Sequence, residues 1–206
     1  MALRFAHIVN PVQVKETSDL FVAQPITFKT MQIAQSVAGD RGLIVDLFTT
    51  QYEEDRSLIP DGFIKTPNLE RSVLDCGKFS IPRKLPLIKD ILDRLYAATE
   101  ADYLIYTNVD IALMPHFYLT VSQLIEQGYD AFTINRRTIL KDYQSMGEIP
   151  LMYAQLGDSH PGHDCFVFPR GVYPHYHLGQ LCLGASLIDR GLLTNMICHA
   201  QNFLGV

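Results

Sequence analysis

Short apolar runs alternate along the chain with longer stretches of helical periodicity, and this alternation constrains the fold more than any other feature. Alternating strands and helices build an α/β protein, because each parallel strand connection needs a long crossover segment. The run Tyr103–Tyr106 is apolar or aromatic on both faces, which is typical of a strand buried inside a parallel sheet. We therefore predict an α/β fold with a mostly parallel sheet flanked by helices.

Local signals place the other elements of this sheet. Apolar runs predict strands over residues 4–9, 43–48, 130–135 and 165–168. Stripes at helical spacing predict helices over residues 25–38, 85–98, 115–127 and 181–203. The segments 51–79 and 140–161 are expected to be mostly loop, with at most one short strand in the first and one or two helical turns in the second. The helix 115–127 and the strands on either side of it would form a β-α-β unit with a right-handed parallel crossover.

Length and charge limit the organisation and the partners. With 206 residues, of which 48% are hydrophobic and 19% charged, the chain can bury a substantial core. We expect residues 1–206 to form a single domain with one binding cleft. The net charge of -5 gives no basic surface for a phosphate backbone, so a nucleic-acid partner is not expected.

The sequence shows no secretory signal pattern and no apolar run of membrane-spanning length, so no transmembrane segment is expected. Its four cysteines lie far apart and none belongs to a C-x-x-C pair. Neither a disulfide framework nor a thiolate zinc site is indicated. These features favour a reducing, cytoplasmic location.

Polar residues follow the buried run at the point where ligands bind in open parallel sheets, beyond the carboxyl ends of the strands. Asn108 and Asp110 lie two positions apart and can present two oxygens to a hard divalent cation such as Mg²⁺, whose shell substrate phosphates complete. The alternative is that Asp110 only helps the chain to leave the strand.

A second polar group precedes the strand predicted at 165–168. His160, His163 and Asp164 lie in a loop with Pro161 and Gly162. A carboxylate held at the start of a strand could act as a general base toward a substrate hydroxyl. The competing interpretation is a turn network with surface histidines.

Two further histidines, His175 and His177, would share one side of an extended segment. Together with His160 and His163 they could form a zinc site, which would suit a metal-dependent hydrolase. Their spacing matches no established zinc pattern, so surface or hydrogen-bonded histidines are the preferred interpretation.

Arg136 and Arg137 follow the strand predicted at 130–135. A guanidinium at that position could bind a phosphate through two hydrogen bonds. An ion pair with the acid-rich segment 51–61 is the alternative. No G-x-G-x-x-G, Walker, G-x-S-x-G or H-E-x-x-H motif occurs, which argues against dinucleotide oxidoreductases, P-loop enzymes, common serine hydrolases and zincins.

Taken together, the early strand, the D-x-D-like Asn108-Val109-Asp110 after a buried strand, the strand at 130–135 and the acid Asp164 opening a later strand resemble the nucleotide-diphospho-sugar transferase fold of GT-A glycosyltransferases. The resemblance implies that Asp110 binds Mn²⁺ or Mg²⁺ on the donor diphosphate. It also implies that Asn108 faces the metal or the ribose and that Asp164 acts as base. The implied activity is metal-dependent transfer of a sugar from a nucleotide-sugar donor to a hydroxyl acceptor, with His160, His163, Arg136 and Arg137 near the substrates.

Two departures from that family's pattern keep other functions open. Asn108 replaces the first acid of the signature, and no histidine follows near Val206 to complete a metal shell. The chain could therefore be C-terminally truncated, or a non-catalytic module that binds a nucleotide or sugar. The metal-dependent hydrolase using the segment from His160 to Asp164 remains the third alternative.

Overall fold

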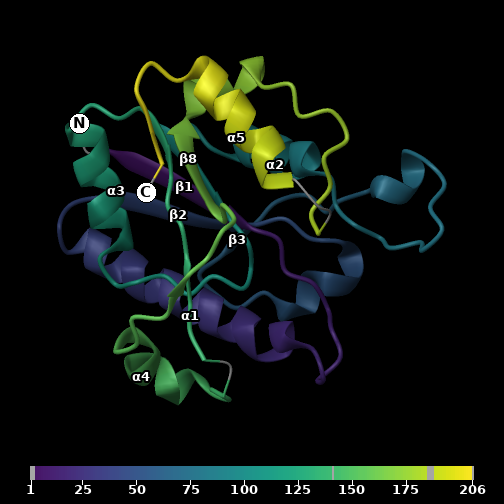
Figure 1. Cartoon of the computed structure of the whole chain (residues 1–206), viewed down its shortest axis with the longest axis horizontal. Coiled ribbons are helices and arrows are strands. Elements are labelled where there is room, and N and C mark those ends of the chain that lie inside the picture. Colours follow the sequence, from purple (N-terminus) through teal and green to yellow (C-terminus); the bar gives the residue numbers. More distant parts are fainter. Residues whose placement is uncertain (1–2, 141, 185–187, 206) are drawn as a thin grey trace.

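The computed structural model describes residues 3–140, 142–184 and 188–205 (Figure 1). These residues form a seven-stranded sheet with the strand order β3-β2-β1-β4-β8-β5-β9. The strands are β1 (Arg4–Val9), β2 (Ile44–Thr49), β3 (Ile64–Lys65), β4 (Tyr103–Thr107), β5 (Ala131–Thr133), β8 (Cys165–Pro169) and β9 (Phe203–Gly205). Within this sheet β8 alone pairs antiparallel, and the other described pairings are parallel. The predicted α/β fold with a mostly parallel sheet is confirmed.

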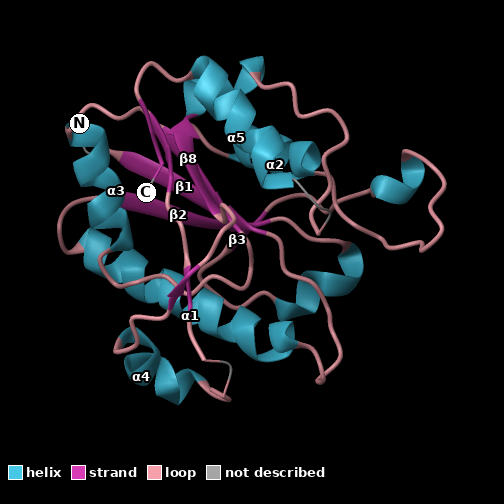
Figure 2. Cartoon of the chain, in the orientation of Figure 1, coloured by secondary structure: helices cyan, strands magenta, loops and turns pink. Residues whose placement is uncertain are grey.

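Helices cover both faces of the sheet (Figure 2). They are α1 (Asp19–Gly39), α2 (Ile88–Ala98), α3 (Phe117–Glu126), α4 (Ile149–Tyr153) and α5 (Ile188–His199), with 3-10 turns η1 (Glu53–Leu58), η2 (Val73–Asp75), η3 (Met146–Glu148) and η4 (Arg170–His175). One buried cluster joins a sheet face to α1 and α3, and a second joins the other face to α2 and α5. None of the described helices is long and apolar enough to cross a membrane.

The predicted β-α-β unit is present as β4, α3 and β5, but another strand lies between its two strands. Strands β4 and β5 run in the same direction but are not neighbours, because β8 lies between them and pairs antiparallel with both. Cys165, Phe166, Val167 and Phe168 are all buried, so β8 contributes side chains to the core on both of its faces. A strand of this composition is suited to a central position, and local sequence does not specify its direction.

Several predicted boundaries also change. Helix α1 begins at Asp19, six residues before the predicted start, because the Ser18 side chain caps it, and Pro25 lies inside the helix. Helix α2 begins at Ile88, since Pro86 precedes it and Leu87 is extended.

The predicted final helix over 181–203 is shorter at both ends, because α5 covers only Ile188–His199. Phe203 belongs to β9, which pairs with β5 and extends the sheet. Residues 185–187 lie outside the described part of the chain. Gly184 has a φ of +81°, in the left-handed region that glycine favours, so it belongs to a turn before this helix.

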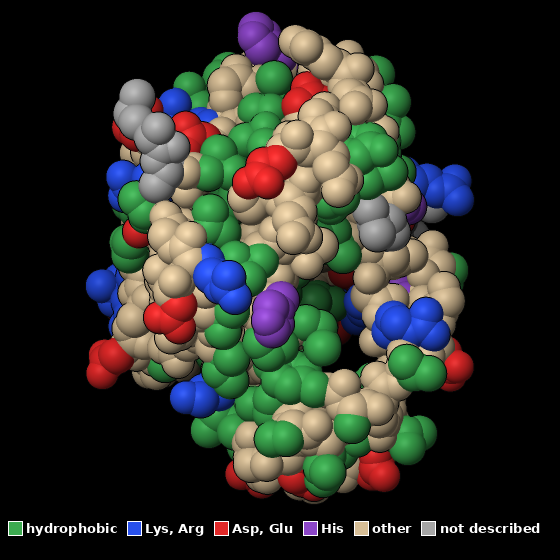
Figure 3. Space-filling view, turned by 90° about the vertical axis from the view of Figure 1, so that its left-hand side faces the viewer, with side chains coloured by type: hydrophobic (Ala, Val, Ile, Leu, Met, Phe, Trp, Pro, Cys, Tyr) green, Lys and Arg blue, Asp and Glu red, His purple; other side chains and the backbone are tan. Residues whose placement is uncertain are grey.

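A small lobe leaves the sheet after β5 and returns before β8. Its neck is a two-stranded ribbon in which β6 (Arg137–Thr138) pairs antiparallel with β7 (Asp158–Ser159). Beyond the neck, Ile149 and Met152 pack with Ile26 of α1. Figure 3 shows hydrophobic side chains gathered over this lobe at the lower end of the molecule. The segment predicted over 140–161 as mostly irregular belongs to this lobe. The one or two helical turns expected there are η3 and α4.

Candidate functional site

The candidate site lies where β4 ends and β8 begins. Because β8 is antiparallel, its first residue, Cys165, is paired with Thr107, the last residue of β4. Phe166 of β8 is likewise paired with Thr133, the last residue of β5. The polar residues just outside these three strand ends therefore gather at one edge of the sheet, which is the edge where ligands bind in open parallel sheets.

Asn108 and Asp164 are joined at this edge by a hydrogen bond. The Asn108 side-chain nitrogen donates to Asp164 Oδ1 over 2.9 Å, and its oxygen accepts from the Tyr106 hydroxyl over 3.1 Å. Burial, followed by the nearby Asp110 and Asp164 carboxylates, raises the pKa of Tyr106, so the hydroxyl keeps the proton that it donates. Both ends of the Asn108 amide are used within the protein.

The Arg136 guanidinium lies between the two carboxylates. Its Nη1 is 3.2 Å from Asp110 Oδ2 and its Nε is 3.1 Å from Asp164 Oδ2. These contacts replace the ion pair with segment 51–61 that was one interpretation of the sequence. The Nε contact with Asp164 lacks hydrogen-bond geometry, so Asp164 Oδ2 is a buried oxygen without a hydrogen-bond partner among the described residues.

His160 completes this group. Its Nε2 lies 3.2 Å from Arg136 Nη2 and 3.6 Å from Asp164 Oδ2. A guanidinium is only a donor, so the arginine contact requires an Nε2 that carries no proton. The His160 carbonyl accepts from the Asn135 side chain over 2.8 Å. Arg136 directly precedes β6 and His160 directly follows β7, so both lie at the end of the neck that joins the lobe to the sheet.

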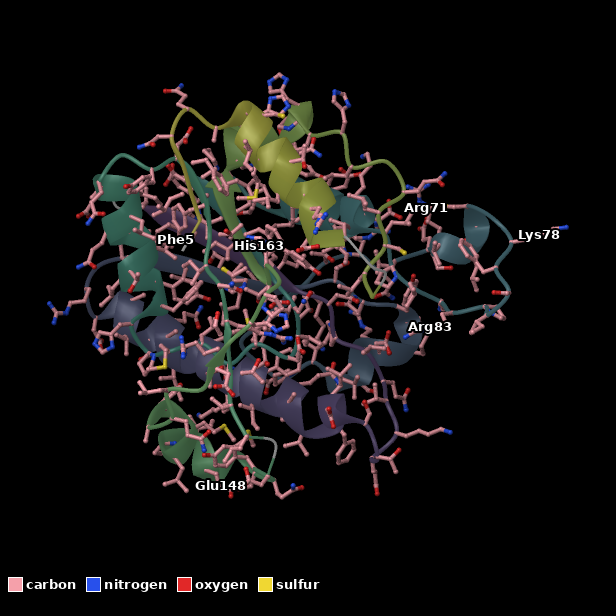
Figure 4. The ribbon with its side chains drawn as sticks, viewed as in Figure 1. Phe5, Arg71, Lys78, Arg83, Glu148 and His163 are labelled. Atoms are coloured by element: carbon pink, nitrogen blue, oxygen red, sulfur yellow. The ribbon has the colours of Figure 1, made fainter. Side chains whose placement is uncertain are left out.

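His163 faces a different feature, a small cavity beside Asn108. Its Nδ1 is 3.5 Å from Asp189 Oδ2 on α5 (Figure 4). The cavity has a volume of about 20 Å³ and is lined by Ile88, Tyr106, Asn108, His163, Phe166, Asp189 and Leu192. A space of that size with polar groups in its wall can hold one water molecule. The cavity therefore adjoins the carboxylate group but is too small for a sugar.

Other residues predicted for the site lie elsewhere. The Arg137 side chain donates to the carbonyls of Leu156 and Gly157 across the neck, so it is separated from the two carboxylates. The His175 ring stacks on the ring of His199 instead of joining His160 and His163. Within the described ranges, no three His, Cys, Asp or Glu side chains are grouped so as to hold a metal ion, so the four-histidine zinc site does not form there.

The residues present fit a divalent cation on one condition, which is that Arg136 moves. Asp110 is partly exposed and supplies hard carboxylate oxygen, and Asp164 Oδ2 is buried and lacks a hydrogen bond. The Asp110 oxygens suit Mg²⁺ or Mn²⁺, whose remaining positions substrate phosphates and water can fill, and Asp164 Oδ2 is left able to accept a proton. The Asn108 oxygen accepts one hydrogen bond from Tyr106, so its second lone pair is the one left for a cation.

Sequence reasoning missed several polar groups near the site. The sequence presents Tyr106 only as one residue of an apolar strand, so its hydroxyl has no predicted role. Asp189 falls in a predicted helix and likewise has no predicted role. At the carboxyl end of β2, Thr49, Thr50 and Gln51 are buried, each with a side-chain oxygen that has no hydrogen-bond partner among the described residues. Their position just at the end of a parallel strand is the signal that could have drawn attention to them.

Comparisons with known proteins support the fold. No protein-family model matches the chain, and no curated protein matches its sequence. Solved structures do match: a candidate nucleotide-diphospho-sugar transferase from Desulfovibrio desulfuricans G20 has a TM-score of 0.51 and 11% identity, over 100% of this chain and 80% of that one. S. aureus TarS, residues 1–349, has a TM-score of 0.54 and 8% identity, over 99% of this chain and 58% of that one.

A third match is CMP:2-keto-3-deoxy-manno-octonic acid synthetase complexed with CTP, with a TM-score of 0.51 and 15% identity, over 100% of this chain and 90% of that one. At such identities the likeness concerns the fold alone. The chain has a nucleotide-diphospho-sugar transferase-like fold.

Proposed function

We propose that residues 1–206 form one nucleotide-sugar transferase-like domain that moves a sugar from a nucleotide-sugar donor to a hydroxyl acceptor. The observation that carries this proposal is the meeting of Asp110, Asp164 and Arg136 at the carboxyl edge of the sheet. One partly exposed carboxylate, one buried carboxylate and one guanidinium are the charges such a transfer needs. The shared fold with sugar and nucleotidyl transferases supports the same class of reaction.

The donor diphosphate would lie against Asp110 and Arg136. Mn²⁺ or Mg²⁺, when held by Asp110, would supply positive charge to the leaving diphosphate. Once Arg136 leaves the carboxylates, its planar guanidinium can bind a phosphate through two parallel hydrogen bonds. Asn108 then keeps Asp164 in place, because their hydrogen bond does not involve Arg136.

Asp164 would act as the general base in an inverting reaction. The acceptor hydroxyl passes its proton to Asp164 Oδ2 while its oxygen bonds to the anomeric carbon. The bond from that carbon to the diphosphate oxygen breaks, and its electron pair leaves with the diphosphate. Asp164 Oδ2 has a lone pair free for the proton, because no hydrogen bond within the described residues occupies this oxygen.

Arg136 has to move for either substrate to bind. In the present arrangement its guanidinium closes off the buried Asp164 oxygen and holds one oxygen of Asp110. One guanidinium between two carboxylates leaves excess negative charge, which repels a diphosphate. Binding of a cation at Asp110 and release of Arg136 to the phosphates would together remove that repulsion.

A non-catalytic binding module is the second candidate function. It is favoured by Asn108, whose amide bonds Tyr106 and Asp164 and adds no negative charge to the site. Such a module would bind nucleotide at this edge without turnover. A hydrolase that uses the segment from His160 to Asp164 is less well supported, because its metal would need three or more protein ligands and no such group of His, Cys, Asp or Glu forms among the described residues. A cation on a donor diphosphate needs only one or two protein carboxylates.

The test is a calorimetric titration with Mn²⁺ and a panel of nucleoside diphosphates, followed by turnover assays with the sugar nucleotides whose bases bind. Binding with transfer to an added hydroxyl acceptor supports the transferase. Binding without turnover supports the module, and zinc retention without nucleotide affinity supports the hydrolase. Release of pyrophosphate from a nucleoside triphosphate and a sugar phosphate would instead show nucleotidyl transfer. Absence of binding for every nucleotide, with and without Mn²⁺, would overturn the proposal.

A further inference from the structure

A loop between η2 and α2 stands away from the body of the protein. In Figure 1 it projects from the right-hand side, and Figure 4 shows Lys78 at its outermost point. Its base is fixed, because the Val73 amide donates to the Leu85 carbonyl over 2.9 Å and Leu87 forms a bridge with Cys182. The projecting part is therefore a narrow tip on an ordered base.

The tip carries large apolar side chains in water. All of residues 77–84 are exposed, and among them Phe79 is 48% and Ile81 is 73% accessible. A single exposed apolar residue is ordinary on a protein surface. Two on the same short projection, with few contacts available to shelter them, indicate a contact surface.

The charge of the loop has one sign. No acidic residue occurs between Asp75 and Asp90, although the whole chain carries a net charge of -5. Lys84 pairs with Glu54. Lys78 and Arg83 have no ion-pair partner within the described ranges, so both cations are free to meet an anionic surface.

We propose that this tip, residues 77–84, binds the surface of an anionic phospholipid membrane. Phe79 and Ile81 would enter the boundary between headgroups and acyl chains, and Lys78 and Arg83 would lie among the anionic headgroups. A narrow convex projection suits a soft lipid interface. It offers little of the broad complementary area that a stable protein interface needs.

The other exposed apolar region, the lobe around α4, does not share this chemistry. Leu151 and Leu156 are 60% and 86% exposed there, but the lobe carries charges of both signs, with the acids Asp142, Glu148 and Asp158 beside Arg137 and Lys141 in the sequence. Negative charge next to apolar side chains opposes contact with an anionic bilayer. The lobe therefore supplies a matched control surface.

The position of the tip relates it to the candidate site. The loop follows the carboxyl end of β3, and parallel strands share that edge with β4. Ile88, which follows the loop, lines the small cavity beside Asn108. Membrane binding through the tip would bring this edge of the sheet near the bilayer, but the proposal stands without any catalytic activity.

The experiment is vesicle flotation of the full chain with two kinds of vesicle. One kind is pure phosphatidylcholine, and the other is phosphatidylserine and phosphatidylcholine at a ratio of about 3 to 7. At that ratio the negative surface potential attracts basic segments. We expect binding to the anionic vesicles that weakens as salt is raised, and little binding to the neutral ones. The double variant Phe79→Ser/Ile81→Ser should bind at least about tenfold more weakly. Lys78→Ser/Arg83→Ser should lose a similar factor, whereas Leu156→Ser should bind as the unchanged protein does.

Three results would each overturn the proposal. These are equal binding to neutral and anionic vesicles, no binding to either, and full binding by either double variant. The substituted side chains are exposed, so circular dichroism and thermal unfolding should confirm that every variant is folded. Nucleotide titration of the same variants separates this proposal from the proposed function, because the tip variants should keep their nucleotide affinity.

Discussion

The Asn108 side-chain nitrogen lies 2.9 Å from Asp164 Oδ1 and joins residues that are 56 positions apart in the chain. This contact changes what a carboxylate at position 108 should do. Asn108→Asp would place two carboxylates within hydrogen-bond distance, where like charges repel. A divalent cation held by Asp110 and the new carboxylate at position 108 would relieve that repulsion.

We therefore expect Asn108→Asp to lower the melting temperature in chelator and to gain more stability from Mn²⁺ than the unchanged protein does. Thermal unfolding with and without millimolar Mn²⁺ measures both effects. Asn108→Ala is the matched control, since it loses the hydrogen bond without adding charge. An equal response of the two variants to Mn²⁺ would argue against a cation site at this edge.

Arg136→Met should destabilise the folded protein at pH 7 by about 1–3 kcal/mol, because the buried Asp164 carboxylate loses its cation. The same change should increase the affinity of the nucleotide-free protein for Mn²⁺, since the guanidinium no longer competes for Asp110. Urea unfolding and metal titration check the two parts. Arg137→Met, one residue further along and outside the carboxylate group, should lose its hydrogen bonds across the neck but leave the affinity for Mn²⁺ unchanged.

Asp110→Ala should abolish Mn²⁺-dependent nucleotide binding and leave the fold intact, because Asp110 is partly exposed at a strand end and contributes little to the core. Isothermal calorimetry with the nucleotide identified in the panel measures the loss. Asp61→Ala, an exposed acid in another loop, is the control. Unchanged affinity in a folded Asp110 variant would remove this residue from the metal site.

Asp164→Asn should leave donor affinity close to that of the unchanged protein and reduce transfer by about 10²–10⁴-fold, the usual contribution of a general base. The amide keeps the size of the side chain and can still accept from Asn108, but it cannot take a proton. Steady-state rates and donor titration together test this. Equal losses of affinity and rate would place Asp164 in the metal shell, and no loss of either would return the loop to a structural role.

His7 should make stability depend on pH. It is buried in β1 between the Tyr118 hydroxyl and Thr107 Oγ1, and burial lowers its pKa to about 3 from a usual value of 6.5. Between these values the unfolded chain binds a proton that the folded protein does not, so stability falls as the pH drops from about 6.5 toward 3. The contribution from this group approaches about 1.4 kcal/mol per pH unit.

Urea unfolding across pH 4–7 should show a shallower slope for His7→Gln than for the unchanged protein, whereas the exposed His116→Gln should keep the slope. If His7→Gln does not fold, NMR of the His7 ring supplies the measurement. A ring that becomes protonated near pH 6 in the folded protein would contradict this prediction.

The sequence by itself determined the fold class and the edge of the sheet where the candidate polar residues lie. Apolar periodicity is a local property, so strands such as Tyr103–Thr107 and the amphipathic α2 could be predicted from their own residues. The positions of Asn108, Asp110 and Asp164 next to strands followed from the same pattern. The first residue of a helix differed from the prediction where a capping side chain such as Ser18 or a proline sets it.

Only the tertiary structure decided which strands are neighbours and which side chains meet. A short apolar strand can pair in either direction. β8 lies antiparallel between β4 and β5, and its pairing partners are far away in the chain, so its own residues do not specify this arrangement. With this arrangement Arg136 lies between Asp110 and Asp164, whereas the adjacent Arg137 donates to the Gly157 carbonyl across the neck of the lobe. Adjacent residues of one type acquired different roles because long-range packing, which local sequence does not encode, fixes the direction of each side chain.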